Sequence, residues 1–214
     1  MLAQSPLLVA IAGGTGSGKT TLTKRLAAAL GEGVVVIEHD WYYLDRAHLS
    51  AEERKHVNYD EPAALDNALL VAHLGELKQG RPVAAPQYDF STHTRSGQGR
   101  QVLPAPVVVV EGILVLAIPE LAAAFDLCIF VDTAADVRLL RRIRRDLLER
   151  GRSLDSVEAQ YVDTVRPMHQ LHVEPSRTRA HLIVPEGGEN AQAIDVIVGR
   201  LKYLLLADVR TDGP

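Results

Sequence analysis

The feature that most constrains this chain is a glycine-rich segment, which reads Gly13-Gly14-Thr15-Gly16-Ser17-Gly18-Lys19-Thr20. It has the spacing of a Walker A loop, in which two glycines, a lysine and a hydroxyl residue stand at fixed positions. The apolar run Leu7–Ala12 precedes the segment and a helical pattern, Gly18–Leu30, follows it. A strand before the loop and a helix after it are the context that the motif requires, so a glycine-rich turn without a ligand is the weaker interpretation.

Each part of this loop suits the binding of phosphates. The glycines allow successive backbone N–H groups to surround an anion, and the positive end of the following helix adds to the field. Lys19 would bring a positive charge to the β- and γ-phosphates, and the Thr20 hydroxyl is a hard oxygen ligand of the kind that Mg²⁺ prefers. The segment therefore predicts that the chain binds a nucleoside triphosphate, ATP or GTP, together with Mg²⁺. It says nothing about a second substrate.

The rest of the chain alternates short apolar runs with longer helical patterns. The predicted strands are Leu7–Ala12, Val34–Ile37, Val107–Val110, Leu127–Val131 and Leu182–Val184. The predicted helices are Gly18–Leu30, Pro62–Gln79, Ala135–Arg150, Ser153–Val173 and Asn190–Ala207. Continuous apolar runs suit parallel strands that are covered on both faces. We therefore predict an α/β fold, a doubly wound parallel sheet with a P-loop NTPase-like core.

The 214 residues correspond to one domain, which we place at residues 1–207, with a short frayed tail at 208–214. Segment 82–106 breaks the alternation, because it is rich in Pro, Gly, Ser, Thr and Gln. Its extended stretches, around Gln87–Phe90 and Arg100–Leu103, predict a β-hairpin flap inserted before the third core strand. Ligands of such sheets bind outside the carboxyl ends of the strands, so the flap could form one wall of a site.

Composition argues against several partners and locations. The 23 basic and 27 acidic residues give a formal charge of −4, whereas a general nucleic-acid binder needs a positive surface to displace counterions. No apolar run approaches the roughly 18 residues of a membrane span, and the first residues lack the pattern of a secretory signal. Cys128 is the only cysteine and cannot form an internal disulfide. We expect a cytoplasmic protein with no nucleic-acid or membrane partner.

Two predicted strands end in carboxylates that should meet at one edge of the sheet. The second strand leads into Glu38-His39-Asp40 and the third into Glu111-Gly112. Glu111 occupies a position that resembles Walker B and would hold Mg²⁺, directly or through water. Asp40 is our candidate for the base that accepts a hydroxyl proton in phosphoryl transfer. An exchange of these two roles, or plain solvated strand ends, remains open.

Six of the ten aromatic side chains fall between positions 41 and 90, outside the predicted core strands. They are Trp41, Tyr42, Tyr43, Tyr59, Tyr88 and Phe90. Such a cluster fits a stacking surface for a planar ligand as well as it fits a small core under the flap. Asp60 and His93 lie among these residues. A carboxylate can accept from two vicinal hydroxyls of a ribose, and a neutral imidazole offers one donor and one acceptor to a base edge.

The segment Arg138–Arg152 holds seven arginines in 15 residues. Helical spacing puts Arg138, Arg141, Arg142, Arg145 and Arg152 on one face, opposite Leu139, Leu140, Ile143 and Leu147. We predict a lid helix over residues 135–152, with its apolar side packed and a row of guanidinium groups facing outward, ready to close over a triphosphate. A solvated face paired with Asp136, Asp146 and Glu149 is the alternative, and a nucleic-acid patch is the least favoured.

Taken together, these motifs resemble the uridine kinase (uridine–cytidine kinase) family over nearly the whole chain, from about Leu8 to about Leu204. The phosphate loop is shared by many families, but the ordered set that follows it is specific. The set is Asp40-Trp41-Tyr42-Tyr43, Asn58-Tyr59-Asp60-Glu61-Pro62, Tyr88-Asp89-Phe90-Ser91-Thr92-His93-Thr94-Arg95, Glu111-Gly112-Ile113-Leu114, Arg141-Arg142-Ile143-Arg144-Arg145-Asp146, Glu149-Arg150-Gly151-Arg152 and Gln160-Tyr161.

The resemblance implies a P-loop kinase core and a role for each site residue. Asp40 would be the base for the nucleoside 5′-hydroxyl, and Asp60 would bind the ribose hydroxyls. Arg145 and Arg150 would serve the transferring phosphates. The acceptor site would consist of Tyr43, Tyr88, Phe90 and His93 around the pyrimidine, completed by Arg142, Arg152 and Gln160. Because His93 keeps its imidazole, we expect both uridine and cytidine to be accepted, giving UMP and CMP in pyrimidine salvage.

One residue departs from the family pattern, one further expectation accompanies the resemblance, and two interpretations compete with it. Glu186 stands where the family more often has arginine, beside the donor base, which leaves the choice between ATP and GTP open. The resemblance also implies a homo-oligomer, a tetramer. The competing interpretations are a related P-loop kinase of the phosphoribulokinase or pantothenate kinase type, and a nucleotide-binding module without phosphotransfer.

Overall fold

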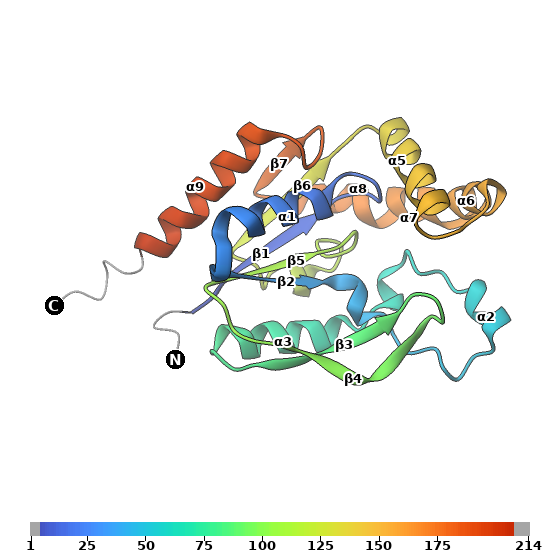
Figure 1. The fold of residues 1–214 in the computed structure, drawn as a ribbon, viewed down its shortest axis with the longest axis horizontal. Helices are drawn as coiled ribbons and strands as arrows, with labels where there is room; N and C mark the ends of the chain where they lie inside the picture. The colour runs from blue at the N-terminus through green and yellow to red at the C-terminus, as the bar shows by residue number, and fades with distance from the viewer. Residues whose placement is uncertain (1–4, 208–214) are drawn as a thin grey trace.

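The computed structural model describes residues 5–207 and is built on one parallel sheet with helices on both faces (Figure 1). The sheet has five strands in the order β2-β5-β1-β6-β7, and all neighbours run parallel. The strands are β1 (Leu7–Ala12), β2 (Val34–Glu38), β5 (Val107–Glu111), β6 (Leu127–Asp132) and β7 (Leu182–Pro185). The predicted doubly wound α/β fold is confirmed. Because β1 is the central strand, the loop that follows it opens between the ends of β5 and β6.

The two faces of the sheet are covered by different helices. Helices α1 (Lys19–Leu30) and α9 (Ala191–Ala207) cover one face, and α3 (Asn67–Lys78) with α4 (Pro119–Ala122) covers the other. Successive side chains of a strand point to opposite faces. In β1, Val9 and Ile11 accordingly pack in the α1/α9 cluster, and Leu8 and Ala10 pack in the α3/α4 cluster. Burial on both sides explains why the strands have apolar residues at consecutive positions.

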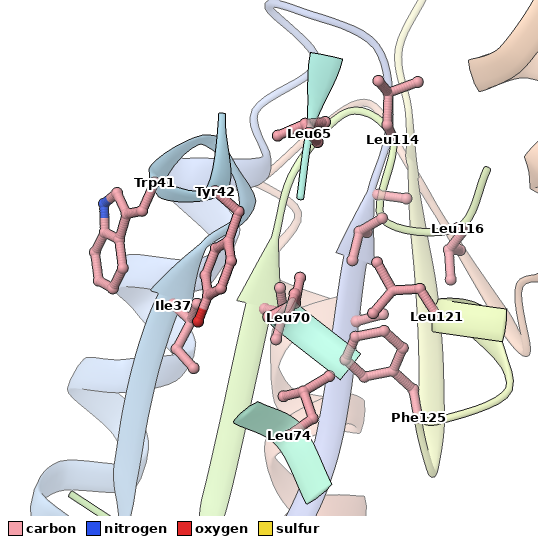
Figure 2. Close-up of a cluster of buried hydrophobic side chains, with 14 of the residues drawn as sticks. Ile37, Trp41, Tyr42, Leu65, Leu70, Leu74, Leu114, Leu116, Leu121 and Phe125 are labelled. Atoms are coloured by element: carbon pink, nitrogen blue, oxygen red, sulfur yellow. The ribbon is translucent and has the colours of Figure 1, made fainter. Parts of the chain in front are cut away.

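The larger hydrophobic cluster continues from the sheet to the segment that carries Asp40. Leu70 and Leu74 of α3 lie in the same cluster as Ile37, at the end of β2, and Tyr42 of the short helix η2 (His39–Tyr42), as Figure 2 shows. Tyr42 is fully buried, and its hydroxyl lies 2.9 Å from Nδ1 of His73. This packing holds the chain immediately after β2 against the sheet edge.

Segment 82–106 forms an antiparallel hairpin, a two-stranded sheet separate from the main one. Strand β3 (Val83–Asp89) pairs with β4 (Thr94–Val102), and the register shifts between Ala85 and Gln87. Pro86 lies at this irregularity, where a residue without an N–H donor is tolerated. Both strands are longer than predicted, and Phe90 belongs to the turn instead of β3. Valine and alanine side chains of the hairpin join the α3 cluster, so the flap is packed onto the domain.

The remaining helical segments lie on the carboxyl side of the sheet or connect strands. They are η1 (Gly31–Gly33), α2 (Ala51–Lys55), η3 (Pro62–Ala64), α5 (Ala135–Leu148), α6 (Leu154–Gln160), η4 (Tyr161–Val165), α7 (Arg166–Met168), η5 (His169–Val173), α8 (Glu174–Ser176) and η6 (Arg177–Arg179). The predicted helix Ser153–Val173 extends to Arg179 and contains two π-helical stretches, η4 and η5. Pro167 and Pro175 follow these stretches closely, and each removes an N–H donor from the helical ladder.

Three further features named in the sequence analysis are the membrane-span criterion, Cys128 and the tail. Between residues 5 and 207, no helix combines the length and apolarity needed to cross a bilayer. Cys128 is buried in β6. The tail predicted at 208–214 lies outside the described residues.

Candidate active site

A cleft of about 660 Å³ lies at the carboxyl edge of the sheet, between the loop after β1, η2, the hairpin and helices α5 and α6. The predicted site residues that line it are Thr15, Gly16, Gly18, Lys19, Thr20, Asp40, Tyr43, Asp60, Tyr88, Phe90, His93, Glu111, Arg142, Arg145, Arg150, Arg152 and Gln160. Gly13, Gly14 and Ser17 belong to the same loop but are not among the lining residues of this cleft. Residues far apart in the chain, from position 15 to position 160, therefore share one cavity.

The phosphate loop adopts a conformation that depends on its glycines. Gly16 and Gly18 have φ angles of 75° and 99°, a region that residues with a side chain rarely occupy. A Cβ atom on Gly16 would lie 2.4 Å from the carbonyl oxygen of Arg138. Helix α1 begins at Lys19 without a side-chain cap and without an acidic residue in its first turn. No side chain at the start of the helix accepts from its first N–H groups, so these groups are available to bind an anion.

Lys19 places its ammonium group inside the loop. Nζ donates to the carbonyl oxygen of Gly14 at 3.0 Å, and the residue is 8% exposed. Burial lowers the pKa of Lys19, and the nearby carboxylates of Glu111 and Asp40 partly oppose this change. The two carboxylates thus supply the opposite charge that a buried ammonium group requires.

Thr20 and Glu111 form a pair of hard oxygen donors beside Lys19. The Thr20 hydroxyl donates to Oε1 of Glu111 at 2.8 Å. Glu111 ends β5 and is the register partner of Glu38 at the end of β2, so two carboxylates stand side by side. Burial, then the charge of Glu111, raises the pKa of Glu38. Hydroxyl and carboxylate oxygens are the ligands that Mg²⁺ takes, so this donor set fits the predicted metal.

Asp40 lies on η2 and faces the same cleft. Burial raises its pKa to about 6, aided by the charges of Glu111 and Glu38 and opposed mainly by Lys19. Its neighbour His39 points elsewhere. Nε2 of His39 lies 2.9 Å from Oδ1 of Asn67, and burial lowers the pKa of His39 to about 4. Asp40 is therefore the residue of this pair that the cleft exposes to a reactant, and its pKa is close to neutral pH, as a general base requires.

The aromatic residues form a small core, and some of them line the cleft. Tyr43 and Tyr88 have ring centroids 5.2 Å apart, and both are buried. Phe90 is 50% exposed and lies edge-on to Tyr88 at 5.3 Å. His93 stacks on Tyr59 at 4.6 Å with an interplanar angle of 19°. Trp41 and Tyr42 belong to the hydrophobic cluster and do not line the cleft, whereas Tyr43 and Tyr88 do both, so a small core is present and a stacking surface for a ligand stays a prediction.

Asp60 faces the cleft from the loop between α2 and η3. Its Oδ2 accepts a hydrogen bond from the Thr164 hydroxyl at 3.3 Å. Burial raises the pKa of Asp60, and the guanidinium groups of Arg142 and Arg152 oppose this change. Asp60 lines the cleft, and a carboxylate has capacity for several hydrogen bonds, so it can also accept from a ligand hydroxyl.

Helix α5 contradicts the prediction of a packed apolar side and an outward row of guanidinium groups. Its buried residues are Arg138, Arg142 and Asp146. Leu140 is 68% exposed, and Leu147 is 38% exposed. The buried side of this helix is thus its charged side.

The reason is the surface that α5 covers. The helix packs over the phosphate loop, whose oxygen atoms need hydrogen-bond donors, and not over the apolar sheet. Arg141 donates from Nη1 to the carbonyl oxygen of Gly16 at 3.4 Å, and Arg142 donates from Nη1 to the Thr15 hydroxyl at 3.3 Å. Arg138 donates from Nε to the carbonyl oxygen of Thr133, in the turn before the helix, at 3.0 Å. Nη2 of Arg142 also donates to Oε1 of Gln160 at 2.7 Å. Buried arginines with such partners are stable where apolar side chains would leave oxygen atoms unsatisfied.

Several lining residues were not among the predicted site residues. They are Thr21, Glu38, Tyr59, Ile113, Gly112, Arg141, Gly188 and Glu189. Gly188 is the most informative, because a Cβ atom there would lie 2.4 Å from both the carbonyl oxygen of Gly18 and the N of Leu22. In the sequence, the adjacent glycines Gly187 and Gly188 are the signal that could have indicated this close approach of two backbone segments. Glu186, the departure noted in the sequence, precedes this pair and has a φ angle of 63°.

Comparison with known proteins gives a consistent result. A model of the phosphoribulokinase / uridine kinase family matches residues 8–193. A uridine kinase of Clostridium tetani is 50% identical over 205 residues, which cover 95% of this chain and 98% of that protein. A uridine kinase of Oceanobacillus iheyensis is 46% identical over 206 residues, which cover 96% of this chain and 98% of that protein. The fold is shared with phosphoribulokinase from Rhodobacter spheroides, with a TM-score of 0.63 at 16% identity over 82% of this chain and 68% of the other.

Proposed function

Since the chain belongs to the phosphoribulokinase / uridine kinase family, we propose that it transfers the γ-phosphoryl group of ATP or GTP to the 5′-hydroxyl of uridine and cytidine. The products are UMP and CMP, which is pyrimidine salvage. The observation that carries this proposal is one cleft in which a phosphate loop faces a pocket of tyrosines and an imidazole. An identity of 50% to a uridine kinase, over 95% of this chain, supports the same substrates. A cytoplasmic location and a tetramer stay predictions.

Different residues of the cleft carry out proton transfer, charge stabilisation and metal binding. Asp40 accepts the proton of the 5′-hydroxyl as its oxygen forms the bond to the γ-phosphorus, and the bond to the leaving nucleoside diphosphate breaks. Lys19, Arg145 and Arg150 stabilise the charge that develops on the phosphoryl oxygens. Thr20 and Glu111 would hold Mg²⁺, which supplies positive charge to the phosphates when bound.

The acceptor is held by groups on the opposite side of the cleft. Asp60 accepts hydrogen bonds from the ribose hydroxyls, and Arg142, Arg152 and Gln160 complete this side. The rings of Tyr43, Tyr88 and Phe90 surround the pyrimidine, and His93 meets its edge. The arrangement suits a flat base joined to a sugar, which neither ribulose 5-phosphate nor pantothenate contains.

A panel of alcohols and labelled ATP tests the proposed function directly. The purified protein should label uridine and cytidine with kcat/KM values at least 100-fold above those for ribulose 5-phosphate and pantothenate. Transfer to ribulose 5-phosphate but not to uridine would identify a related kinase of another specificity. Tight binding of the triphosphate without transfer to any alcohol would identify a nucleotide-binding module.

The pKa of Asp40 sets an expected pH dependence. Burial raises this pKa to about 6, so the carboxylate takes up a proton at a higher pH than an exposed aspartate does. The protonated form cannot act as the base. We therefore expect kcat/KM for uridine to be constant above pH 7 and to fall about tenfold per unit below about pH 6. The affinity for a non-hydrolysable ATP analogue, measured over the same range, is the control. A flat kcat/KM profile down to pH 4.5 would contradict the assignment.

His93 is expected to influence the choice between uridine and cytidine. Burial lowers the pKa of His93, so its ring is neutral and offers one donor and one acceptor nitrogen. The residue has a φ angle of 55°, which asparagine tolerates better than most residues. His93→Asn should change the ratio of kcat/KM for the two nucleosides at least fivefold and leave the KM for ATP within twofold. His56→Asn, at an exposed histidine outside the cleft, is the matched control. An unaltered ratio would remove His93 from base recognition.

A further inference from the structure

We propose that Asp146 is a positioning residue, one buried carboxylate that gathers four arginines at the side of the cleft and so serves both substrates. The proposal rests on the proposed nucleoside kinase function. Arg142, Arg145, Arg150 and Arg152 are the arginines concerned. Asp146 itself does not line the cleft, so any effect that it has on the reaction acts through these side chains.

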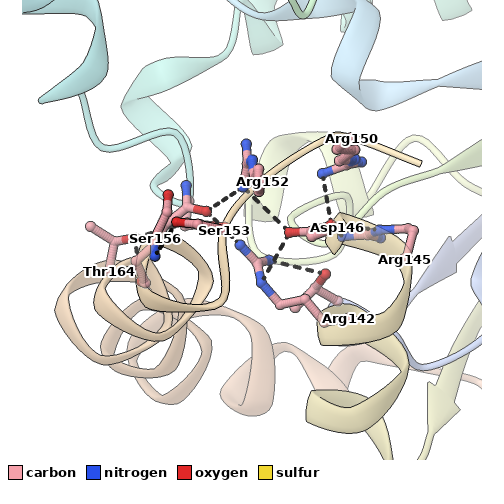
Figure 3. Close-up of polar contacts among 11 residues, drawn as sticks. Arg142, Arg145, Asp146, Arg150, Arg152, Ser153, Ser156 and Thr164 are labelled. Atoms are coloured by element: carbon pink, nitrogen blue, oxygen red, sulfur yellow. Dashed lines mark hydrogen bonds and ion pairs between the residues drawn. The ribbon is translucent and has the colours of Figure 1, made fainter. Parts of the chain in front are cut away.

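Both oxygen atoms of Asp146 are used, and its side chain is completely buried. Oδ1 lies 2.8 Å from Nη2 of Arg145 and 3.5 Å from Nη1 of Arg150. Oδ2 lies 3.3 Å from Nη1 of Arg152 and 3.7 Å from Nε of Arg142. Figure 3 shows these arginines converging on the carboxylate from the helix and from the segment after it.

The same residue also shapes the backbone that follows α5. The backbone N of Arg152 donates to the carbonyl oxygen of Asp146 at 3.1 Å. Gly151 provides the necessary turn with a φ angle of 61°. The chain therefore folds back on the end of the helix. As a result Arg150 and Arg152, which lie beyond the helix, reach the same cleft as Arg142 and Arg145.

The four arginines form two pairs with different surroundings. Arg142 and Arg152 both donate to Oε1 of Gln160, at 2.7 and 2.6 Å, and their charges act on Asp60. This pair belongs to the acceptor side.

Arg145 and Arg150, whose side chains are 31% and 46% exposed, form the second pair, which we assign to the donor side. The charge of Arg145 acts on Lys19, and the charge of Arg150 acts on Asp40. Asp146 lies within ion-pair distance of all four arginines and so connects the two pairs.

The charges explain why one carboxylate matters here. Four guanidinium groups repel one another, and a single buried carboxylate compensates one of the four positive charges. The remaining charge faces a cleft that is suited to a polyphosphate. Without Asp146, the guanidinium groups would still attract an anion but would lose the partner that orients them. Removal of Asp146 should therefore disturb the orientation of the arginines, and with it kcat, more than it weakens the affinity for an anionic donor.

Asp146→Asn tests this separation, with Asp136→Asn, an exposed residue of the same helix, as the matched control. In D146N, kcat for uridine should fall at least 30-fold, while the Kd for a non-hydrolysable ATP analogue stays within threefold. A purely structural role would weaken donor binding and lower the Tm together with kcat. A kcat within threefold of that of the unmodified protein, or an equal loss in kcat and donor affinity, would overturn the proposal.

A second measurement reports the accessibility of the arginine side chains and does not depend on catalytic activity. Modification by phenylglyoxal, followed by mass spectrometry, should be at least threefold faster at Arg145 and Arg150 in D146N, because both guanidinium groups form an ion pair with Asp146. D136N should show unchanged rates. Unchanged rates in D146N would refute the positioning role even if uridine proved not to be a substrate, whereas failure on uridine alone would refute the proposed function.

A longer carboxylate keeps the test decisive if D146N does not fold. Asp146→Glu retains the charge and displaces it by about one carbon–carbon bond. We expect at least a fivefold loss of kcat with an unchanged Kd for the ATP analogue. A kcat equal to that of the unmodified protein would overturn the proposal.

Discussion

Asp40→Asn is expected to lower kcat for uridine about 1,000-fold and to leave the Kd for a non-hydrolysable ATP analogue within threefold. The change keeps the shape of the side chain and removes its ability to take a proton, and such a base typically contributes a factor of about 10²–10⁴. The charge of Asp40 acts on Lys19, but Asp40 lies on η2, outside the phosphate loop, so donor binding should persist. Single-turnover and steady-state kinetics with labelled ATP, combined with calorimetry, give both quantities.

Glu111→Gln distinguishes the roles of Glu111 and Asp40, because the sequence does not decide which of them is the base and which is the metal ligand. Glu111 accepts the hydrogen bond of Thr20, so its loss should raise the Mg²⁺ concentration needed for half-maximal rate. Asp40→Asn should not change that concentration. The reverse pattern, with the Mg²⁺ requirement moved by the change at Asp40, would show that the base and the metal ligand have been assigned the wrong way round.

Lys19→Met is expected to reduce kcat by a factor of about 10²–10³ and to raise the KM for ATP about tenfold. Lys19 is the one lysine that lines the described cleft, and a positioned charge at a transferring phosphate usually accounts for an effect of this size. The ammonium group is buried, and burial lowers its pKa, so an apolar side chain of similar length removes a desolvation cost. We therefore expect a Tm equal to or above that of the unmodified protein.

The exposed Lys24 on the same helix provides the control for this experiment. Lys24→Met should leave kcat and the KM for ATP within twofold, because Lys24 does not line the cleft. A Lys19→Met protein that retains more than a tenth of its kcat would show that the phosphates are stabilised mainly by the arginines of the lid.

The parts of the fold that could be predicted are those whose signal is local. The predicted strand Leu7–Ala12 coincides with β1, because a strand covered on both faces is apolar at consecutive positions. Helix boundaries were less accurate. The predicted helix Pro62–Gln79 divides into η3 and α3, since Asp66 caps the second helix by accepting from the N of Leu69 at 3.2 Å. An N-cap residue inside a helical pattern indicates that one helix ends and another begins, and the predicted boundaries did not take Asp66 into account.

The candidate site was predicted as a set of separate motifs, and the tertiary structure brings those motifs to one cavity. Asp60 and Gln160 are 100 positions apart, yet both line the cleft. The hairpin is joined to the segment after Asp40 by Arg95, which donates to the carbonyl oxygens of Tyr42 and Tyr43 at 3.0 and 2.8 Å. Nothing in the spacing of these residues indicates such a contact.

Amino-acid order alone specifies the phosphate loop, the α/β class and the acidic strand ends, since each depends on residues that are adjacent in the chain or repeat with the period of a strand or helix. The buried side of α5 depends instead on what lies opposite the helix. Arg142 is buried and Leu140 is exposed because the surface that α5 covers presents loop oxygens instead of apolar side chains. A helical pattern records which residues share a face, but the chemistry of the surface that receives that face arises only when distant segments pack together.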